Sequence, residues 1–320
     1  MTPRILVIRG GAIGDFVLTL PAIKLLRDNF PDAHLEILGY KHIIALAEGR
    51  FYAHATRSIE YAAMAGFFIP DAKLAPDLIE YFASFHQIVS YLFDPDGIFE
   101  DNMRRCGVKN FIHISPKLDD SGHAASQLAR PLQDLALFLE DPAPQIYPSP
   151  ADREFASSFF GGLESRIIAI HPGSGSDIKN WPVKNWRALG DWLFSLQPTP
   201  AILLIGGEAD RASHAALSDA WKHCHVYFAE DVPLPHLAAL LERCSLFIGH
   251  DSGISHIAAA TGIQCLLMFG PTDPEVWAPA NPRVKWLAAP GSAMANLPLY
   301  EVREQITQLL QPPNPTIPPP

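Results

Sequence analysis

The two halves of the chain begin with the same pattern, and this repetition constrains the fold more than any other feature. An arginine opens an aliphatic run at residues 4–8 and again at residues 166–170, and each run leads into a glycine-rich turn. Apolar residues at helical spacing follow over residues 16–29. A buried strand, a polar turn and a helix in that order are typical of a parallel sheet. The sequence therefore predicts an α/β fold with two facing Rossmann-like domains, each built on a parallel sheet.

A proline-dense segment at residues 141–150 separates the two halves, and we interpret it as a linker. A length of 320 residues also suits two domains. We therefore expect an N-terminal domain at residues 1–145, a C-terminal domain at residues 146–311 and a disordered proline-rich tail at residues 312–320. Strands alternating with helices are predicted in the second half at residues 201–205, 225–228, 246–248, 265–269 and 284–287.

The first half is less regular after its second predicted strand, at residues 34–39. Further strands are predicted at residues 87–93 and 111–115. Residues 62–70 form an apolar stretch that contains Gly and Pro but has no clean period. The favoured interpretation is a loop folded over the core. The alternative is an exposed apolar lip for a lipid-linked partner.

Composition narrows the class of protein. Hydrophobic residues make up 48% of the chain and charged residues 18%, so a large core is available. The net charge is −10 and neither half is basic, which gives no support to nucleic-acid binding. The four cysteines form no C-x-x-C pair and the histidines show no metal-ligand spacing, so we expect reduced thiols and no metal site. Without a leader sequence or a long apolar run, we expect a soluble protein with at most a surface association with membrane.

The first glycine-rich turn does not match a nicotinamide-binding fingerprint. That fingerprint is G-x-G-x-x-G, and here Ala12 stands in place of the second glycine after Gly10. The acid expected at the end of the second strand is also missing, because that strand ends at Gly39. A dehydrogenase is therefore disfavoured.

A polar turn at residues 249–256 lies between a predicted buried strand and an Ala-rich helix. Asp251 and Ser252 stand where a helix N-cap belongs, and Gly253 lets a ligand approach the backbone. The helix start offers N–H groups and a positive dipole end, which suit a phosphate. The alternative is that Asp251 or Ser252 only caps the helix and His256 packs against the sheet.

Two other predicted strand ends carry residues that suit a nucleotide. Ser174, Gly175 and Ser176 offer hydroxyl and backbone N–H groups, and Lys179 follows with a mobile positive charge. Glu208 comes after the next strand and is a residue type that binds ribose hydroxyls. Taken singly, Lys179 is typical of a surface lysine and Glu208 of a solvated helix-start acid. Together with the turn at Asp251 they predict a site for a nucleoside diphosphate.

Several motifs occur in one order along the chain: Arg9, Gly14-Asp15 and Leu20-Pro21-Ala22; His171-Pro172-Gly173-Ser174 and Lys179-Asn180-Trp181-Pro182; Gly206-Gly207-Glu208; Asp251-Ser252-Gly253-Ile254-Ser255-His256; and Phe269-Gly270-Pro271-Thr272-Asp273-Pro274. This series resembles the lipopolysaccharide heptosyltransferases, glycosyltransferase family 9. The resemblance covers nearly the whole chain and is sparse only between residues 40 and 140. It implies a GT-B fold and a metal-independent, inverting transfer of heptose from ADP-heptose to inner-core lipopolysaccharide, with no cofactor beyond the nucleotide-sugar donor.

The resemblance also implies roles for single residues. Asp15 matches the general base of the family, Lys179 its diphosphate-binding lysine and Glu208 its ribose-binding acid. The residues that match its donor-binding positions are Gly14, Ser174, Gly175, Ser176, Asp251, Ser252, Gly253 and His256. The chain departs from the family at Gly10, Gly11 and Ala12, where hydroxyl residues are common, at Ser252, where Thr is common, and by one inserted residue before Lys179.

The implied partners are a nucleotide sugar and a lipid-linked saccharide acceptor, met in the cytoplasm or by peripheral contact at the inner face of the cytoplasmic membrane. Asp15, predicted in a loop across the cleft from the donor, would remove the proton of the acceptor hydroxyl. The alternative is that Asp15 only caps the helix that begins at Phe16. Two other functions stay open: a GT-B glycosyltransferase with another nucleotide sugar or acceptor, and a non-catalytic nucleotide-binding protein. Asp15 argues against the second, because a pure binder needs no acid there.

Overall fold

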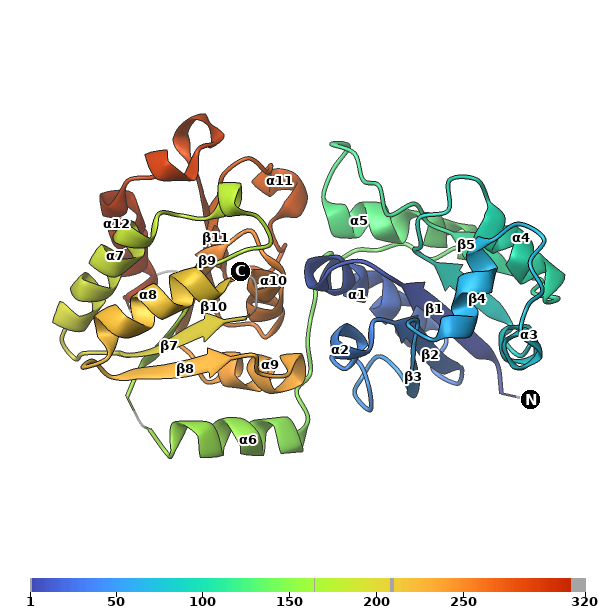
Figure 1. Ribbon diagram of the computed structural model, residues 1–320, viewed down its shortest axis with the longest axis horizontal. Helices are drawn as coiled ribbons and strands as arrows, with labels where there is room; N and C mark the ends of the chain where they lie inside the picture. Colours follow the sequence, from blue (N-terminus) through green and yellow to red (C-terminus); the bar gives the residue numbers. More distant parts are fainter. Residues whose placement is uncertain (1, 164, 208–209, 312–320) are drawn as a thin grey trace. The chain divides into compact units, whose positions relative to one another are not determined.

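The computed structural model describes residues 2–163, 165–207 and 210–311 (Figure 1). Two of the predictions, the tail at residues 312–320 and the role of Glu208, lie outside the described residues. The chain divides into two compact units. The first comprises Met1–Asp152 with Pro233–Pro235, and the second comprises Arg153–Val232 with His236–Pro320.

The first unit contains a five-stranded sheet in which every pairing is parallel and the order is β3-β2-β1-β4-β5. The predicted strands are present, although β4 and β5 are shorter than expected, and β3 was not predicted. Its strands are β1 (Arg4–Arg9), β2 (His34–Gly39), β3 (Ala55–Ser58), β4 (Gln87–Ser90) and β5 (Phe111–His113). Its helices are α1 (Ile13–Asn29), α2 (Lys41–Ile44), η1 (Ala62–Phe68), α3 (Pro76–Ala83), α4 (Ile98–Arg105), α5 (Ala124–Ala129) and η2 (Arg130–Leu135).

The core of the first unit forms because β1 is apolar on both faces. Leu6 and Ile8 pack with side chains from η1, α3 and α4, and α1 packs against α5. The segment at residues 62–70 contributes to this core as a 3-10 helix rather than as a loop. Its Met64 and Phe67 are buried, whereas Phe68 and Ile69 are 44% and 54% exposed. The segment thus covers the core with one side and presents apolar side chains to solvent with the other.

The second unit contains a six-stranded parallel sheet in the order β11-β10-β9-β6-β7-β8. The strand positions agree with the sequence-based ones to within two residues at each end. The strands are β6 (Ile167–His171), β7 (Ala201–Gly206), β8 (Val226–Glu230), β9 (Leu246–His250), β10 (Gln264–Phe269) and β11 (Val284–Ala288). The helices are α6 (Pro150–Phe160), η3 (Asp177–Lys179), α7 (Val183–Ser195), α8 (Arg211–Trp221), α9 (Leu234–Glu242), α10 (Gly253–Ala260), α11 (Pro274–Trp277), η5 (Pro290–Ser292), η6 (Met294–Asn296) and α12 (Leu299–Leu310).

Three tryptophans fill the core on the side of this sheet covered by α7, α8 and α12. Trp181, Trp186 and Trp221 are each at most 1% exposed. Gly190 of α7 lets α8 approach closely, because a Cβ there would lie 2.2 Å from the Trp221 ring. This packing leaves the carboxyl ends of the strands to the loops that carry the polar motifs.

Both sheets have the strand order of a Rossmann fold. Counted from the first strand of each unit, the orders are 3-2-1-4-5 and 3-2-1-4-5-6. The order reverses between β1 and β4 in the first unit and between β6 and β9 in the second. Open α/β sheets bind ligands outside the carboxyl ends of the strands at such a reversal. Ligand-binding sites are therefore expected at these two reversals of strand order.

Candidate functional site

Asp15 lies in the first turn of α1, not in a loop as the sequence suggested. The helix begins at Ile13, so Asp15 is its third residue and Ala12 takes the N-cap position. The carboxylate folds back, and its Oδ2 accepts a hydrogen bond from the Ala12 N–H at 2.8 Å. Asp15 therefore does support the helix start, although from inside the helix rather than as the N-cap before Phe16. Its side chain remains 39% exposed, which leaves it accessible to a ligand.

Gly11 makes this arrangement possible. Its backbone has φ +95°, and a Cβ at this position would lie 2.7 Å from Asp15 Oδ2. A residue with a side chain would therefore meet both backbone strain and a clash with the carboxylate. Gly14, the second residue of α1, belongs to the same turn.

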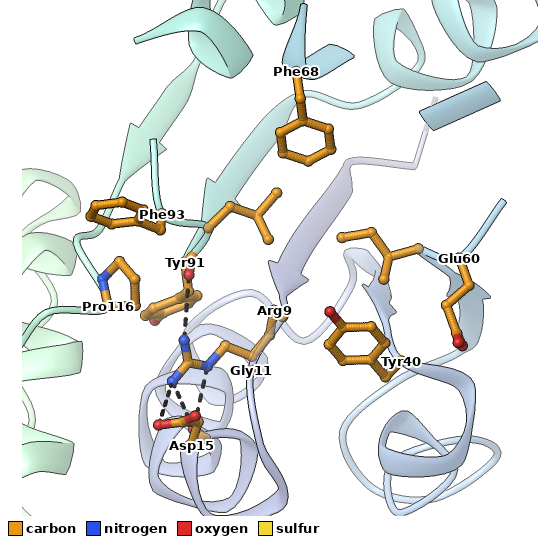
Figure 2. A pocket seen from close by; sticks show the side chains of 12 residues that line it. Arg9, Gly11, Asp15, Tyr40, Glu60, Phe68, Tyr91, Phe93 and Pro116 are labelled. Atoms are coloured by element: carbon orange, nitrogen blue, oxygen red, sulfur yellow. Dashed lines mark hydrogen bonds and ion pairs between the residues drawn. The ribbon is translucent and has the colours of Figure 1, made fainter. Parts of the chain in front are cut away.

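Arg9, at the end of β1, fixes the position of Asp15 through hydrogen bonds. Its side chain is buried, and Nε and Nη2 donate to the backbone oxygen of Asp15 at 3.3 and 3.2 Å. Nη1 donates to the backbone oxygen of Tyr91, and Nη2 lies 3.6 Å from Asp15 Oδ1 (Figure 2). Burial lowers the pKa of Arg9, and the charge of Asp15 opposes that change. The guanidinium thus links the ends of β1 and β4 and fixes the backbone that carries Asp15.

A cavity of about 530 Å³ opens above this pair. Every strand of the sheet contributes to it through the segment that follows its carboxyl end, which is where the topology predicts a ligand. Its volume is within the range of roughly 300–1,000 Å³ usual for small-molecule sites. Its walls are Arg9, Gly10, Gly11, Asp15, Tyr40, Ile59, Glu60, Phe68, Tyr91, Leu92, Phe93 and Pro116.

In the second unit the structure brings Lys179 and Asp251 together. Lys179 ends η3, after β6, and Asp251 follows β9, the neighbouring strand. Lys179 Nζ lies 2.6 Å from Asp251 Oδ2, and the Thr272 hydroxyl donates to the same oxygen at 2.7 Å. The lysine side chain is 28% exposed and the carboxylate 10%. The pair thus forms one edge of the site, with the cation more open to solvent than the anion.

In the loop from Ser174 to Ser176, the Ser174 hydroxyl already forms hydrogen bonds within the protein. Ser174 is buried, and its Oγ lies 2.8 Å from both the Ser176 backbone oxygen and Asn180 Oδ1. The space around Gly175 is open, because a Cβ there would meet no atom within 4 Å. The exposed backbone at Gly175, rather than the Ser174 hydroxyl, is therefore what this loop offers to a ligand.

Ser252 is the N-cap of α10, a position that both sequence interpretations gave to Asp251 or Ser252. Its Oγ accepts a hydrogen bond from the Ser255 N–H at 3.3 Å. Gly253 is the first residue of the helix, and its N–H points outward from the helix start as such groups do. His256 lies one turn into the helix and is 4% exposed.

His250, at the end of β9, fixes the loop that carries Lys179. Its Nε2 accepts from the Trp181 N–H at 2.8 Å, and its Nδ1 lies 3.4 Å from the Gly173 oxygen. Burial, aided by the neighbouring His171, lowers the pKa of His250 to about 3. The imidazole is therefore neutral at physiological pH, with Nδ1–H as its donor.

Residues 123–302, more than half of the chain, match the sequence profile of glycosyltransferase family 9 (heptosyltransferase). The chain belongs to glycosyltransferase family 9. It is 24% identical over 295 residues to lipopolysaccharide heptosyltransferase 3 of Escherichia coli, covering 83% of each chain.

Solved structures of family 9 members have the same fold. A family 9 glycosyltransferase from Veillonella parvula DSM 2008 has a TM-score of 0.76 at 17% identity, with 97% of each chain covered. An E. coli heptosyltransferase solved with ADP has a TM-score of 0.71 at 15% identity, covering 96% of this chain and 99% of that one. The α/β, GT-B fold class predicted from the sequence is confirmed, and the protein is a glycosyltransferase.

Within this family 9 chain, sequence reasoning missed a buried pair beside Ser252. His171 Nε2 lies 2.9 Å from Asp210 Oδ2, and His171 Nδ1 lies 3.3 Å from Ser252 Oγ. Asp210 also fills the space beside Gly173, where a Cβ would lie 1.6 Å from its Oδ1. His171 belongs to the His171-Pro172-Gly173-Ser174 motif. Its position at the carboxyl end of a predicted strand was the only sequence signal that it lies in the site.

Other candidates have structural explanations. Asp94-Pro95-Asp96 places two carboxylates close together, as a metal-binding pair would. Both Asp94 oxygens accept backbone N–H groups at the start of α4, from Phe99 and Glu100. In the part of the chain that the structure describes, no three His, Cys, Asp or Glu side chains gather as metal ligands do.

No helix within residues 2–163, 165–207 and 210–311 is long and apolar enough to cross a membrane.

Proposed function

We propose that this protein is an inverting glycosyltransferase that moves a heptose from ADP-heptose to a saccharide of a lipopolysaccharide core. The observation that carries this proposal is the exposed Asp15 carboxylate, held by Arg9 inside a cavity at the strand-order reversal of the first unit. The relatives support the choice of sugar and nucleotide, because they are named lipopolysaccharide heptosyltransferases and one related enzyme was solved with ADP-2-deoxy-2-fluoro heptose.

The second unit is the proposed donor domain. Lys179 and the helix start at Ser252 and Gly253 supply positive charge and N–H groups for the diphosphate. The open backbone at Gly175 and Ser176 allows the diphosphate to approach closely. Asp251 positions Lys179, and His256 supports the helix from its buried face. Glu208 is the proposed ribose-binding acid on the strength of its motif alone.

The first unit is the proposed acceptor domain, with Asp15 as general base. Asp15 takes the proton of an acceptor hydroxyl as that oxygen attacks the anomeric carbon of the donor. The new carbon–oxygen bond forms while the bond from that carbon to the diphosphate breaks, and ADP leaves with the electron pair. Attack from the face opposite the leaving group inverts the configuration.

Charge that develops on the departing diphosphate is stabilised by groups already in place. The Lys179 ammonium and the N-terminus of α10 are held by hydrogen bonds before the donor binds, so little reorganisation is needed. No divalent ion and no cofactor is required in this mechanism. The acceptor is lipid-linked, so we place the enzyme in the cytoplasm with peripheral contact at the inner face of the cytoplasmic membrane.

The test is a thermal-shift comparison of ADP, UDP and GDP, followed by turnover with ADP-heptose and a lipopolysaccharide-core acceptor. ADP should stabilise the protein more than UDP or GDP at equal concentration, and ADP should be released only when the acceptor is present. A larger shift with UDP would assign the protein to another nucleotide sugar. If the protein binds a nucleotide but transfers no sugar to any saccharide, it is a non-catalytic nucleotide-binding protein.

A further inference from the structure

The cavity above Asp15 has walls that are aromatic and acidic rather than basic. Tyr40, Phe68 and Phe93 line it, and their side chains are 38%, 44% and 52% exposed. What sets these three apart from other exposed rings of the chain is that they line one cavity together with a carboxylate at its floor, and apolar side chains gathered at one place are typical of a binding site. Figure 2 shows Phe93 on one side of the cavity, Tyr40 on the other and Phe68 at the end away from Asp15.

Two of the three rings pack against a neighbouring side chain, and the third follows a strand of the sheet directly. Phe68 stacks on Phe99 of α4 with ring centroids 5.2 Å apart, and Phe93 carries Lys117 over its face at 4.5 Å. Tyr40 is the N-cap of α2, directly after β2. The three rings therefore offer flat apolar surfaces to a ligand in the cavity.

The charges in the cavity walls add up to an excess of one negative charge. The charged side chains there are Arg9, Asp15 and Glu60. Arg9 is buried and its donors are directed at Asp15 and Tyr91, which leaves it unavailable to a ligand. Glu60 is exposed, and its Oε2 accepts only long contacts of 3.4 Å from the Ser58 hydroxyl and the Lys41 N–H. The accessible charged groups in the walls are thus both carboxylates, and the Lys117 ammonium, which lies over the Phe93 ring, is outside the lining.

We infer that this cavity selects an uncharged saccharide ring as the acceptor unit and disfavours one that carries a phosphate. This rests on the proposed function, since Asp15 is taken as the base that receives the acceptor proton. The C–H face of a sugar ring packs on aromatic side chains. Its hydroxyl groups donate hydrogen bonds, which the carboxylates of Asp15 and Glu60 accept. A phosphate near these carboxylates would meet like charges in a partly enclosed site.

The test compares two forms of one saccharide. Core oligosaccharide released from lipopolysaccharide is used with its phosphates intact and after their chemical removal, and binding is measured by NMR without donor. The dephosphorylated form should bind at least about fivefold more tightly. Phe93→Ala and Phe68→Ala should each weaken its binding by about three- to tenfold, the effect of losing one aromatic contact. Tyr300→Ala removes a ring of α12 that is 67% exposed and does not line the cavity, and it should not change saccharide binding.

Glu60→Gln tests the charge itself. This variant should bind the phosphorylated saccharide more tightly than the wild type does, so that the difference in affinity between the two forms becomes smaller. Glu80→Gln removes an exposed charge from α3 and should leave that difference unchanged. Equal or tighter binding of the phosphorylated saccharide to the wild-type protein would overturn the inference, even with sugar transfer intact. The reverse result, correct binding preference without transfer from ADP-heptose, would contradict the proposed function and leave the preference for an uncharged ring standing.

Discussion

Lys179 Nζ lies 2.6 Å from Asp251 Oδ2, so the lysine assigned to the diphosphate already has a carboxylate partner from a loop 72 residues away. The Thr272 hydroxyl shares the same oxygen. In the proposed mechanism, a bound diphosphate would meet this oriented ammonium, and it would meet the Asp251 carboxylate if the ammonium were removed. Lys179 would then both bind the phosphate and shield it from a neighbouring negative charge.

Lys179→Ala should weaken ADP binding by about 1.5–3 kcal/mol, the range for a hydrogen bond to a charged group. Adding Asp251→Asn to this variant should restore part of the affinity, because it removes the exposed repulsion. Calorimetric titration of ADP into the single and double variants measures both effects. Lys222→Ala breaks an exposed ion pair with Asp219 in the same unit and serves as the control. Wild-type affinity in Lys179→Ala would make the lysine a surface residue.

Sugar transfer should not depend on a divalent ion. Both carboxylate oxygens of Asp94, in the Asp94-Pro95-Asp96 sequence, accept backbone N–H groups at the start of α4. In the proposed mechanism, Lys179 and a helix start balance the charge of the diphosphate. The initial rate with ADP-heptose should be the same after dialysis against EDTA as before. A loss of activity that magnesium or manganese reverses would show that a metal takes the place assigned to Lys179.

The stability of the second unit should fall in mild acid because of His250. Its pKa is lowered to about 3 in the folded protein, mainly by burial, whereas an unfolded histidine has a pKa of about 6.5. Below pH 6.5 the unfolded chain binds the extra proton, so the free energy of unfolding decreases as the pH falls towards 3. From pH 7 to pH 5 this contributes a loss of about 2 kcal/mol.

Urea unfolding of the wild type and of His250→Gln at the two pH values measures this contribution. The variant should be less stable at pH 7, since the contact to the Trp181 N–H is disturbed, yet its stability should depend less on pH. His223→Gln replaces an exposed histidine of the same unit and should keep the wild-type slope. An unchanged slope in His250→Gln would mean that burial does not lower the pKa of His250 below that of an unfolded histidine.

The regular parts of the fold could be predicted because their signals are local. The apolar run of β9 and the glycine-rich turns were visible in the sequence, and they indicated the carboxyl ends of the strands as the place for ligands, whereas the strand order and its reversal come from the structure. β3, of four half-buried residues, has neither alternation nor a buried run, so nothing in the sequence marked it. Glu60, which follows β3, and the cavity it lines were missed for the same reason.

The details of the site could be predicted less well, because they rest on contacts between distant residues. The Lys179–Asp251 pair and the contact of Arg9 with the Tyr91 oxygen join segments more than 70 residues apart. The helix start was misplaced at Phe16 because Ile13 and Gly14 are not strong helix formers. Here Asp15 itself stabilises that start, through the bond from the Ala12 N–H, which no propensity scale includes.

The central claim is that Asp15 is the general base, and the structure allows a clean test of it. Asp15→Asn keeps an oxygen that can accept the Ala12 N–H, and the bonds of Arg9 to the Asp15 backbone oxygen do not involve the side chain. The fold and the ADP affinity should therefore be preserved. Asp28→Asn, an exposed change near the other end of α1, controls for the loss of one negative charge from this helix.

The decisive measurement is single-turnover heptose transfer from ADP-heptose by Asp15→Asn, with ADP affinity measured on the same preparation. An amide cannot take the acceptor proton, so the transfer rate should fall by about 10²–10⁴ while ADP binds as it does to the wild type. Transfer at close to the wild-type rate would contradict the account, because Asp15 would then only stabilise the start of α1 and the first unit would have no catalytic residue.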